Sequence, residues 1–135
     1  MIGMDDLYRE LILEHYRHPR RRGRLDHPDV SAEEHNPLCG DRVRIDLRIE
    51  NGIIIDARFD GRGCAISQAS ASMLTDEIVG MPVEQAKQFS KEQLLALIGV
   101  PLNHNPVRIK CALLPLKTLK VGLYGVGHAP DDDEM

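Results

Sequence analysis

Residues 42–60 read RVRIDLRIENGIIIDARFD, and this stretch is the clearest indication of the fold. From Arg42 to Glu50 apolar and charged side chains alternate, a pattern typical of a strand with one buried and one charged face. Asn51-Gly52 then gives the strongest short hairpin signal. On the return strand we expect the core face to be formed by Ile53, Ile55, Ala57 and Phe59. The stretch therefore predicts an antiparallel pair of strands.

Helical patterns flank the hairpin on both sides. Before it, the spacing predicts a helix from about Asp5 to Arg17. After it, apolar residues from Ile66 to Ile78 return to helical spacing. Because a two-stranded ribbon is marginal alone, a third strand or a covering helix is needed, and residues 29–36 are the nearby candidate strand. This order predicts an α+β fold with helices packed on one face of a small antiparallel sheet.

Two further helices are expected in the second half of the chain. Ser90 and Gln93 form a capping-box pattern ahead of one of them. A last helix is predicted to begin near Cys111, with Pro115 in its first turn. The basic run from Arg17 to Arg24 is interpreted as a solvated connection, with a docking patch for an acidic partner as the alternative.

Composition limits the classes of protein that fit. A chain of 135 residues suits one domain, expected over residues 1–128, with an acidic tail at 129–135 that we expect to be disordered. The net charge of −4 argues against general nucleic-acid binding. No apolar run is long enough to span a membrane, and the N-terminus lacks the pattern of a secretory signal. We therefore expect a cytoplasmic, reducing setting, in which the three cysteines are poor disulfide candidates.

The cysteines instead suggest a metal or thiol site. Cys39 precedes a predicted strand, Cys64 lies between a strand and a helix, and Cys111 opens the last predicted helix. The positive end of a helix dipole stabilises a thiolate, the form that binds metal and attacks sulfur. Asp41, two residues after Cys39, is the expected fourth ligand of a tetrahedral site. Inert buried cysteines are the plainer alternative.

The surroundings of these four residues bear on the same hypothesis. Three thiolates, one carboxylate and one divalent ion sum to about −2, a charge that cations could offset. Three cations neighbour the ligands in sequence: Arg42, Arg62 and Lys110. His35 and His104 are weaker ligand candidates than Asp41.

Several blocks carry a resemblance to the U-type iron–sulfur assembly family, whose branches are called IscU and SufU. The blocks, in the family's order, are LYRELILEHY (7–16), NPLCGDR (36–42), DARF (56–59), GRGCAIS (61–67), ASASM (69–73) and PVRIKC (106–111). The resemblance implies a three-stranded sheet with the site at one end. It also implies that Cys39, Asp41, Cys64 and Cys111 hold zinc in a resting form.

The resemblance also implies partners and cargo. A pyridoxal-phosphate cysteine desulfurase would supply persulfide sulfur, and the IscU branch builds a transient [2Fe–2S] cluster on the three cysteines for transfer to apo-proteins. The SufU branch is a zinc-dependent sulfurtransferase that relays persulfide without itself holding the cluster. We expect Cys111 or Cys64 to accept the sulfur, and we expect a scaffold more than an enzyme.

Features of both branches are present. Lys110 stands where the IscU branch carries His, as in the SufU branch, whereas the segment from Cys64 to Cys111 is short for the SufU branch. The IscU chaperone motif is only partly matched by residues 104–108, so the resemblance gives only weak support for recognition by a specialised Hsp70. A scaffold, a sulfur relay and a structural-zinc interaction domain all stay open.

Overall fold

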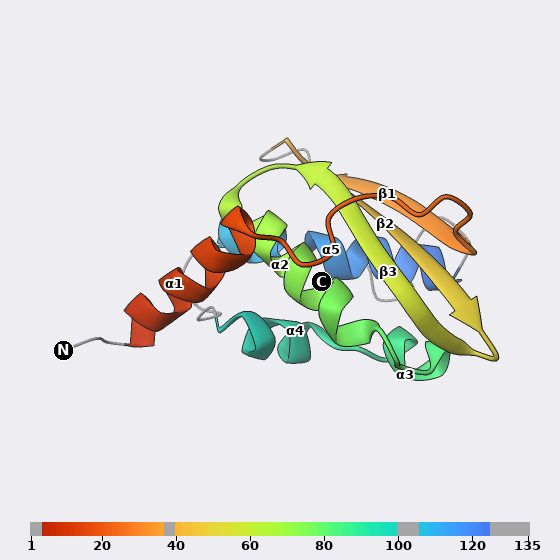
Figure 1. Cartoon of the computed structure of the whole chain (residues 1–135). Helices are drawn as coiled ribbons and strands as arrows, with labels where there is room; N and C mark the ends of the chain where they lie inside the picture. Colours follow the sequence, from red (N-terminus) through yellow and green to blue (C-terminus); the bar gives the residue numbers. More distant parts are fainter. Residues whose placement is uncertain (1–3, 37–39, 100–105, 125–135) are drawn as a thin grey trace.

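The computed structural model describes residues 4–36, 40–99 and 106–124 (Figure 1). Its sheet has three antiparallel strands in the order β1-β2-β3. These are β1 (Val30–Asn36), β2 (Asp41–Glu50) and β3 (Ile53–Arg62). The predicted hairpin is β2–β3, and the candidate strand at 29–36 is β1. The predicted α+β class is confirmed.

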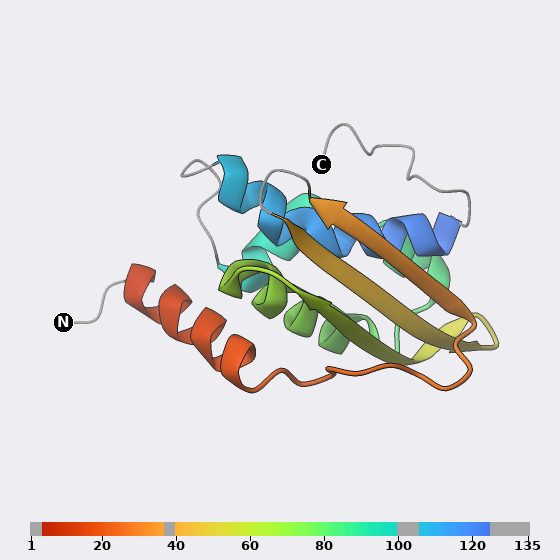
Figure 2. The ribbon, with the colours of Figure 1, turned by 90° about the horizontal axis from the view of Figure 1, so that it is seen from above.

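Helices cover one face of this sheet, as Figure 2 shows. In chain order the helices are α1 (Met4–Arg17), α2 (Ala65–Ile78), α3 (Val83–Lys87), α4 (Lys91–Ile98) and α5 (Pro106–Tyr124), and α2 and α5 make most of the contact with the sheet. Helix α5 packs against β1 and β2, while α2 packs against β3 and α5. Ser90 and Gln93 form the predicted capping box of α4. Helix α1 projects from one end of the molecule and contacts α2.

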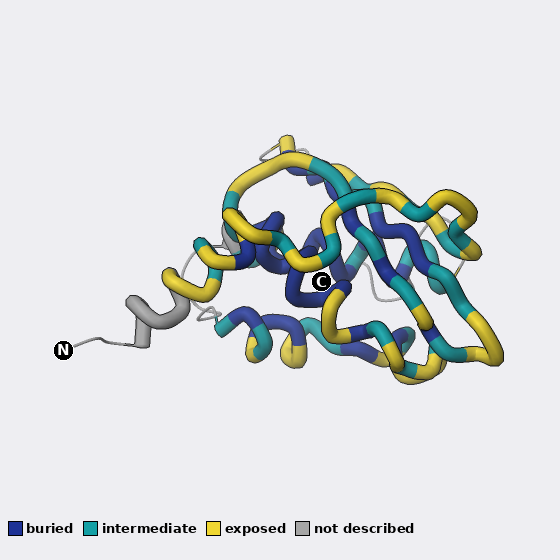
Figure 3. Tube along the Cα trace, viewed as in Figure 1, coloured by how far each residue is buried: buried dark blue, intermediate teal, exposed yellow. Residues whose placement is uncertain are grey.

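The core is almost entirely aliphatic and lies between the sheet and the helices. On β2 the alternating residues Val43, Ile45 and Leu47 are each at most 1% exposed. Much of α2 and α5 is buried (Figure 3). Among the described residues no helix has the length and apolar character needed to cross a bilayer.

The hairpin differs from the prediction near its tip. Ile54 is fully buried, whereas Ile55, expected on the core face, is 39% exposed. The register explains the difference, because Arg48 pairs with Asp56 but Ile49 pairs with Ile54. One extra residue on β3 therefore interrupts the alternation, which is a β-bulge. Ala57 and Phe59 are buried as expected.

The last helix also begins earlier than predicted. Helix α5 starts at Pro106, a residue that suits the first helical position because its missing N–H needs no partner there. Cys111 therefore lies inside the helix, and Pro115 is an interior proline. The expectation that Cys111 opens the helix is wrong.

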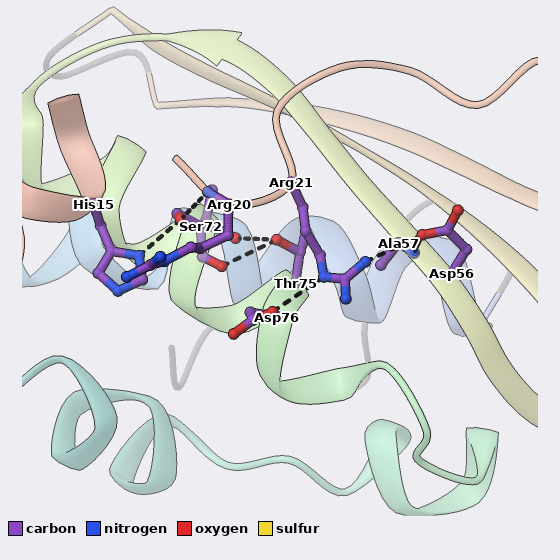
Figure 4. A network of polar contacts seen from close by, with 9 residues as sticks. His15, Arg20, Arg21, Asp56, Ala57, Ser72, Thr75 and Asp76 are labelled. Carbon is purple, nitrogen blue, oxygen red and sulfur yellow. Dashed lines mark hydrogen bonds and ion pairs between the residues drawn. The ribbon is translucent and has the colours of Figure 1, made fainter. Parts of the chain in front are cut away.

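The basic connection after α1 is part of the fold. Its backbone pairs with β3: Phe59 N–H donates to the Arg21 carbonyl at 3.0 Å, and Gly23 N–H donates to the Phe59 carbonyl at 2.8 Å. Arg21 also forms ion pairs of 3.2 Å with both Asp56 and Asp76 (Figure 4). Most side chains of this run are exposed, as expected of a solvated connection, but its backbone also covers the outer edge of β3.

Candidate metal centre

Three of the four predicted ligands meet at one end of the sheet. Asp41 begins β2, Cys64 is the N-cap residue of α2, and Cys111 lies in α5. One carboxylate oxygen and the two sulfurs all lie within 4.8 Å of one another. Residues 23 to 70 positions apart in the chain are thus brought together by the fold.

Asp41 and Cys64 are in direct contact. The Cys64 backbone N–H donates to Asp41 Oδ1 at 3.2 Å, and the Cys64 Sγ lies 3.4 Å from Asp41 Oδ2. Asp41 is only 2% exposed, whereas Cys64 is exposed. Because Cys64 is the N-cap residue of α2, the N-terminal N–H groups and dipole of that helix favour negative charge at this point. The predicted placement of Cys64 at a helix N-terminus is confirmed.

Gly63 makes the contact between Asp41 and Cys64 possible. Its φ of +154° is one that side-chain-bearing residues rarely adopt. A Cβ at this position would collide with the side chain of Asp41. Glycine is therefore required before Cys64 because any larger residue would displace Asp41, a requirement that the sequence pattern alone did not reveal.

Cys111, on α5, is 3% exposed. The Nδ2 atom of Asn36, the last residue of β1, lies 3.9 Å from its sulfur. The Ser70 hydroxyl donates to the Ala112 carbonyl at 2.6 Å, which ties α2 to α5 beside the site. Asn36 belongs to the sequence block 36–42, but the sequence did not predict its contact with Cys111.

Cys39 lies outside the described residues, so its predicted role stays a prediction. The described residues that flank it, Asn36 and Asp41, are cross-strand partners at the site. The Gly40 N–H donates to the Asn36 carbonyl at 2.8 Å, and Gly40 adopts a φ of +73°. His104 also lies outside the described residues.

His35, the other described candidate ligand, and the cation Arg42 lie on the sheet face away from Asp41. His35 and Arg42 are cross-strand partners, and strand alternation places them on the sheet face opposite to Asn36 and Asp41. His35 Nε2 lies 3.8 Å from Glu33 Oε2, and the Arg42 Nε lies 4.0 Å from Glu33 Oε1.

The remaining predicted cations lie at the rim. Arg62, at the end of β3, is exposed and pairs across the strands with Arg42. Lys110 is also exposed, next to Cys111 on α5.

The donor set fits a zinc ion. Zinc takes thiolate, imidazole and carboxylate ligands in tetrahedral sites, with sulfurs about 3.8 Å apart when each Zn–S bond is about 2.3 Å. Ligand atoms within 4.8 Å of one another need only small shifts to reach that spacing. Two sulfurs and one carboxylate oxygen leave one tetrahedral position, for which the sequence offers Cys39.

Comparisons with known proteins agree with this geometry. The family model for the NifU-like N-terminal domain matches residues 7–126. The "zinc-dependent sulfurtransferase SufU" of Bacillus subtilis is 39% identical over 138 residues, covering 90% of this chain and 92% of its own length. The "iron-sulfur cluster assembly scaffold protein IscU" of Thermotoga maritima is 35% identical over 136 residues, covering 90% and 96%.

A solved structure shows the same fold. The crystal structure of a candidate iron–sulfur cluster assembly scaffold protein for the SUF system, from Fervidobacterium islandicum, superposes with a TM-score of 0.71. It is 28% identical, and the match covers 90% of this chain and 99% of that one.

Proposed function

The chain belongs to the family of NifU-like N-terminal domains, and from this premise we propose that it is an iron–sulfur cluster assembly protein. In this role it accepts sulfur from a cysteine desulfurase, carries a transient [2Fe–2S] cluster as cargo and passes that cluster to apo-proteins. The observation that carries the proposal is the meeting of Asp41, Cys64 and Cys111 within 4.8 Å at one end of the sheet.

We propose that Cys39, Asp41, Cys64 and Cys111 hold zinc in the resting protein. Bound zinc would keep the thiols deprotonated and protect them from oxidation until a partner docks. The fold supplies the rest: the N-terminus of α2 offers positive potential at Cys64, and the Cys64 N–H orients the Asp41 carboxylate at 3.2 Å. The exposed Arg62 and Lys110 offset part of the negative charge of the ligands.

The sulfur acceptor is one of the two cysteines that the sequence indicated. Cys64 is exposed and Cys111 is buried, so exposure supports Cys64 as the first acceptor. Its thiolate attacks the outer sulfur of the desulfurase persulfide. The new S–S bond forms on Cys64 as the old one breaks, and the electron pair leaves with the desulfurase thiolate. No net oxidation occurs in this exchange.

A second function is supported by the 39% identity to a zinc-dependent sulfurtransferase. In that case the chain relays persulfide and another protein holds the cluster. Both functions need the same ligands, so the ligand geometry supports them equally. In either case we propose a cytoplasmic setting, a pyridoxal-phosphate desulfurase as sulfur donor and apo iron–sulfur proteins as the final acceptors.

One experiment separates these functions. Desulfurase turnover and cluster yield are measured side by side under anaerobic conditions, with zinc-loaded and zinc-free protein. A [2Fe–2S] spectrum that transfers to an apo-ferredoxin supports the scaffold. Stimulation of the desulfurase that requires zinc and Cys64, without a transferable cluster, supports the relay. If neither activity appears, the proposed function is wrong.

A further inference from the structure

Cys111 is a buried sulfur, and its place in α5 decides which groups can stabilise it. It lies in the second turn of α5, past the N-terminal N–H groups that would favour a thiolate. With 3% of its surface exposed, water stabilises its charge little. A hydrogen-bond donor from another element would stabilise a thiolate in this position.

Asn36 provides such a donor. Its amide Nδ2 lies 3.9 Å from the Cys111 sulfur, within the longer range typical of N–H···S bonds, and the residue is 7% exposed. A carboxamide carries two N–H donors and no charge, so it can stabilise a sulfur anion without competing for the metal. Hydrogen bonds to ligand sulfurs tune the affinity and electronic properties of metal and cluster sites.

The backbone of Asn36 is held by contacts with the start of β2. Its carbonyl accepts the Gly40 N–H at 2.8 Å. Its partner across the sheet is Asp41. Asn36 therefore lies against both the strand that carries Asp41 and the helix that carries Cys111.

We propose that Asn36 is a positioning residue of the site, and that its side-chain amide holds the Cys111 sulfur in place and tunes its donor strength. This inference rests on the proposed metal centre but not on sulfur transfer or cluster assembly. It concerns the bond to Cys111 alone, so Cys64 should be unaffected.

The test replaces Asn36 with Leu, which keeps the shape of the side chain but removes the donor. Zinc affinity, measured by competition with a chromophoric chelator, should fall about tenfold. In the cobalt(II)-loaded protein, the sulfur-to-cobalt charge-transfer band should move to longer wavelength, because a sulfur without a hydrogen bond gives up charge more easily. The control is Ser31→Ala, which removes another side-chain hydrogen bond of β1, the 2.7 Å bond to Asp46.

The control separates a site effect from general loosening of the strand. Ser31→Ala should change the free energy of unfolding and leave the cobalt band in place. An unchanged band in folded Asn36→Leu protein overturns the inference. Desulfurase activity is not used in this test, so the proposed function can fail while the role of Asn36 stands, and the reverse also holds.

A second measurement uses the unaltered chain and so does not depend on the variant folding. In protein loaded with cadmium-113 and labelled with nitrogen-15 at asparagine, the Asn36 amide protons should show scalar coupling to the metal through the Cys111 sulfur. If Asn36→Leu does not fold, the absence of this coupling overturns the inference.

Discussion

Asp41 and Gly63 depend on each other, because the carboxylate occupies space that a side chain at position 63 would need. Asp41 itself is buried and bonded to the backbone of Cys64. At the scale of single residues, the position of the Asp41 carboxylate therefore depends on the absence of a side chain at Gly63.

Replacing Gly63 with Ala should lower zinc affinity at least tenfold. The new methyl group displaces Asp41 and with it the hydrogen bond to Cys64. The matched control is Gly23→Ala, because Gly23 has a comparable φ of +138° but nothing within 4 Å of a Cβ. Both variants should carry a similar backbone strain of about 1–3 kcal/mol, measured by urea denaturation. Equal zinc affinity in the two variants would show that the collision does not matter.

Replacing Asp41 with Ala should lengthen the lifetime of a [2Fe–2S] cluster on the protein. Oxygen is a harder donor than sulfur, so Asp41 is the weakest ligand of a sulfur-rich site and the one expected to leave during transfer. Cluster loss is followed by visible absorption under anaerobic conditions. Asp56→Ala, which removes a carboxylate paired with Arg21 away from the site, is the control and should match the parent. Faster loss in Asp41→Ala would contradict this role.

The ligands were predictable from the sequence to different degrees. Cys64 could be placed at a helix N-terminus because a strand pattern ends and a helical pattern begins around it. The bond from Asn36 to Cys111 joins residues 75 positions apart, and no local pattern encodes such a contact. Gly63 was visible as a glycine, but its closeness to Asp41 depends on how β2 and β3 pair.

At the scale of elements, α1 is held to α2 by a small polar cluster (Figure 4). His15 Nδ1 lies 2.8 Å from the Ser72 Oγ, which also accepts the Arg20 backbone N–H at 3.1 Å. Burial, and then the charge of Arg20, lower the pKa of His15 below its usual 6.5, against smaller opposing effects of Asp76 and Glu14. The contact between α1 and α2 therefore favours the neutral form of the His15 imidazole.

We expect stability to depend on pH through His15. Because the pKa of His15 is lower in the folded chain than in the unfolded one, the unfolded chain binds the proton first as pH falls through 6.5. The free energy of unfolding should decrease from pH 7.5 to 5.5 more in the parent than in His15→Asn, which keeps a hydrogen-bonding atom but does not titrate. Urea denaturation of both proteins at both pH values measures this. Identical decreases would mean that His15 contributes nothing.

Elements with a regular pattern were predictable, and those shaped by distant contacts were not. The alternation in β2 and the capping box of α4 are local signals, and both are confirmed. The bulge at Ile55 depends on how β3 pairs with β2, which the hairpin signal does not specify. The start of α5 was misplaced because Pro115 was assigned to a first turn, although packing against the sheet lets the helix tolerate an interior proline.

At the scale of the molecule, the core and the metal centre are separate parts of the fold. The buried aliphatic residues lie between the sheet and helices α2 and α5, and between these two helices and α4. The candidate ligands lie at one end, where β2 begins, α2 starts and α5 passes. A core of this kind does not need an ion to hold its layers together, unlike small domains whose folding energy comes from zinc.

We therefore expect zinc removal to weaken the fold without abolishing it. At a free zinc concentration one hundred times the dissociation constant, binding should add about 2.7 kcal/mol to the free energy of unfolding. Chelation should lower the melting temperature accordingly, while the far-ultraviolet circular dichroism of the zinc-free protein stays that of an α+β fold. Cys64→Ser, which removes one ligand, should show a smaller difference between zinc-loaded and zinc-free samples. A zinc-free chain that is unfolded at room temperature would favour the structural-zinc domain over a cluster scaffold, because a scaffold that must exchange its zinc for iron cannot depend on zinc to hold the chain together.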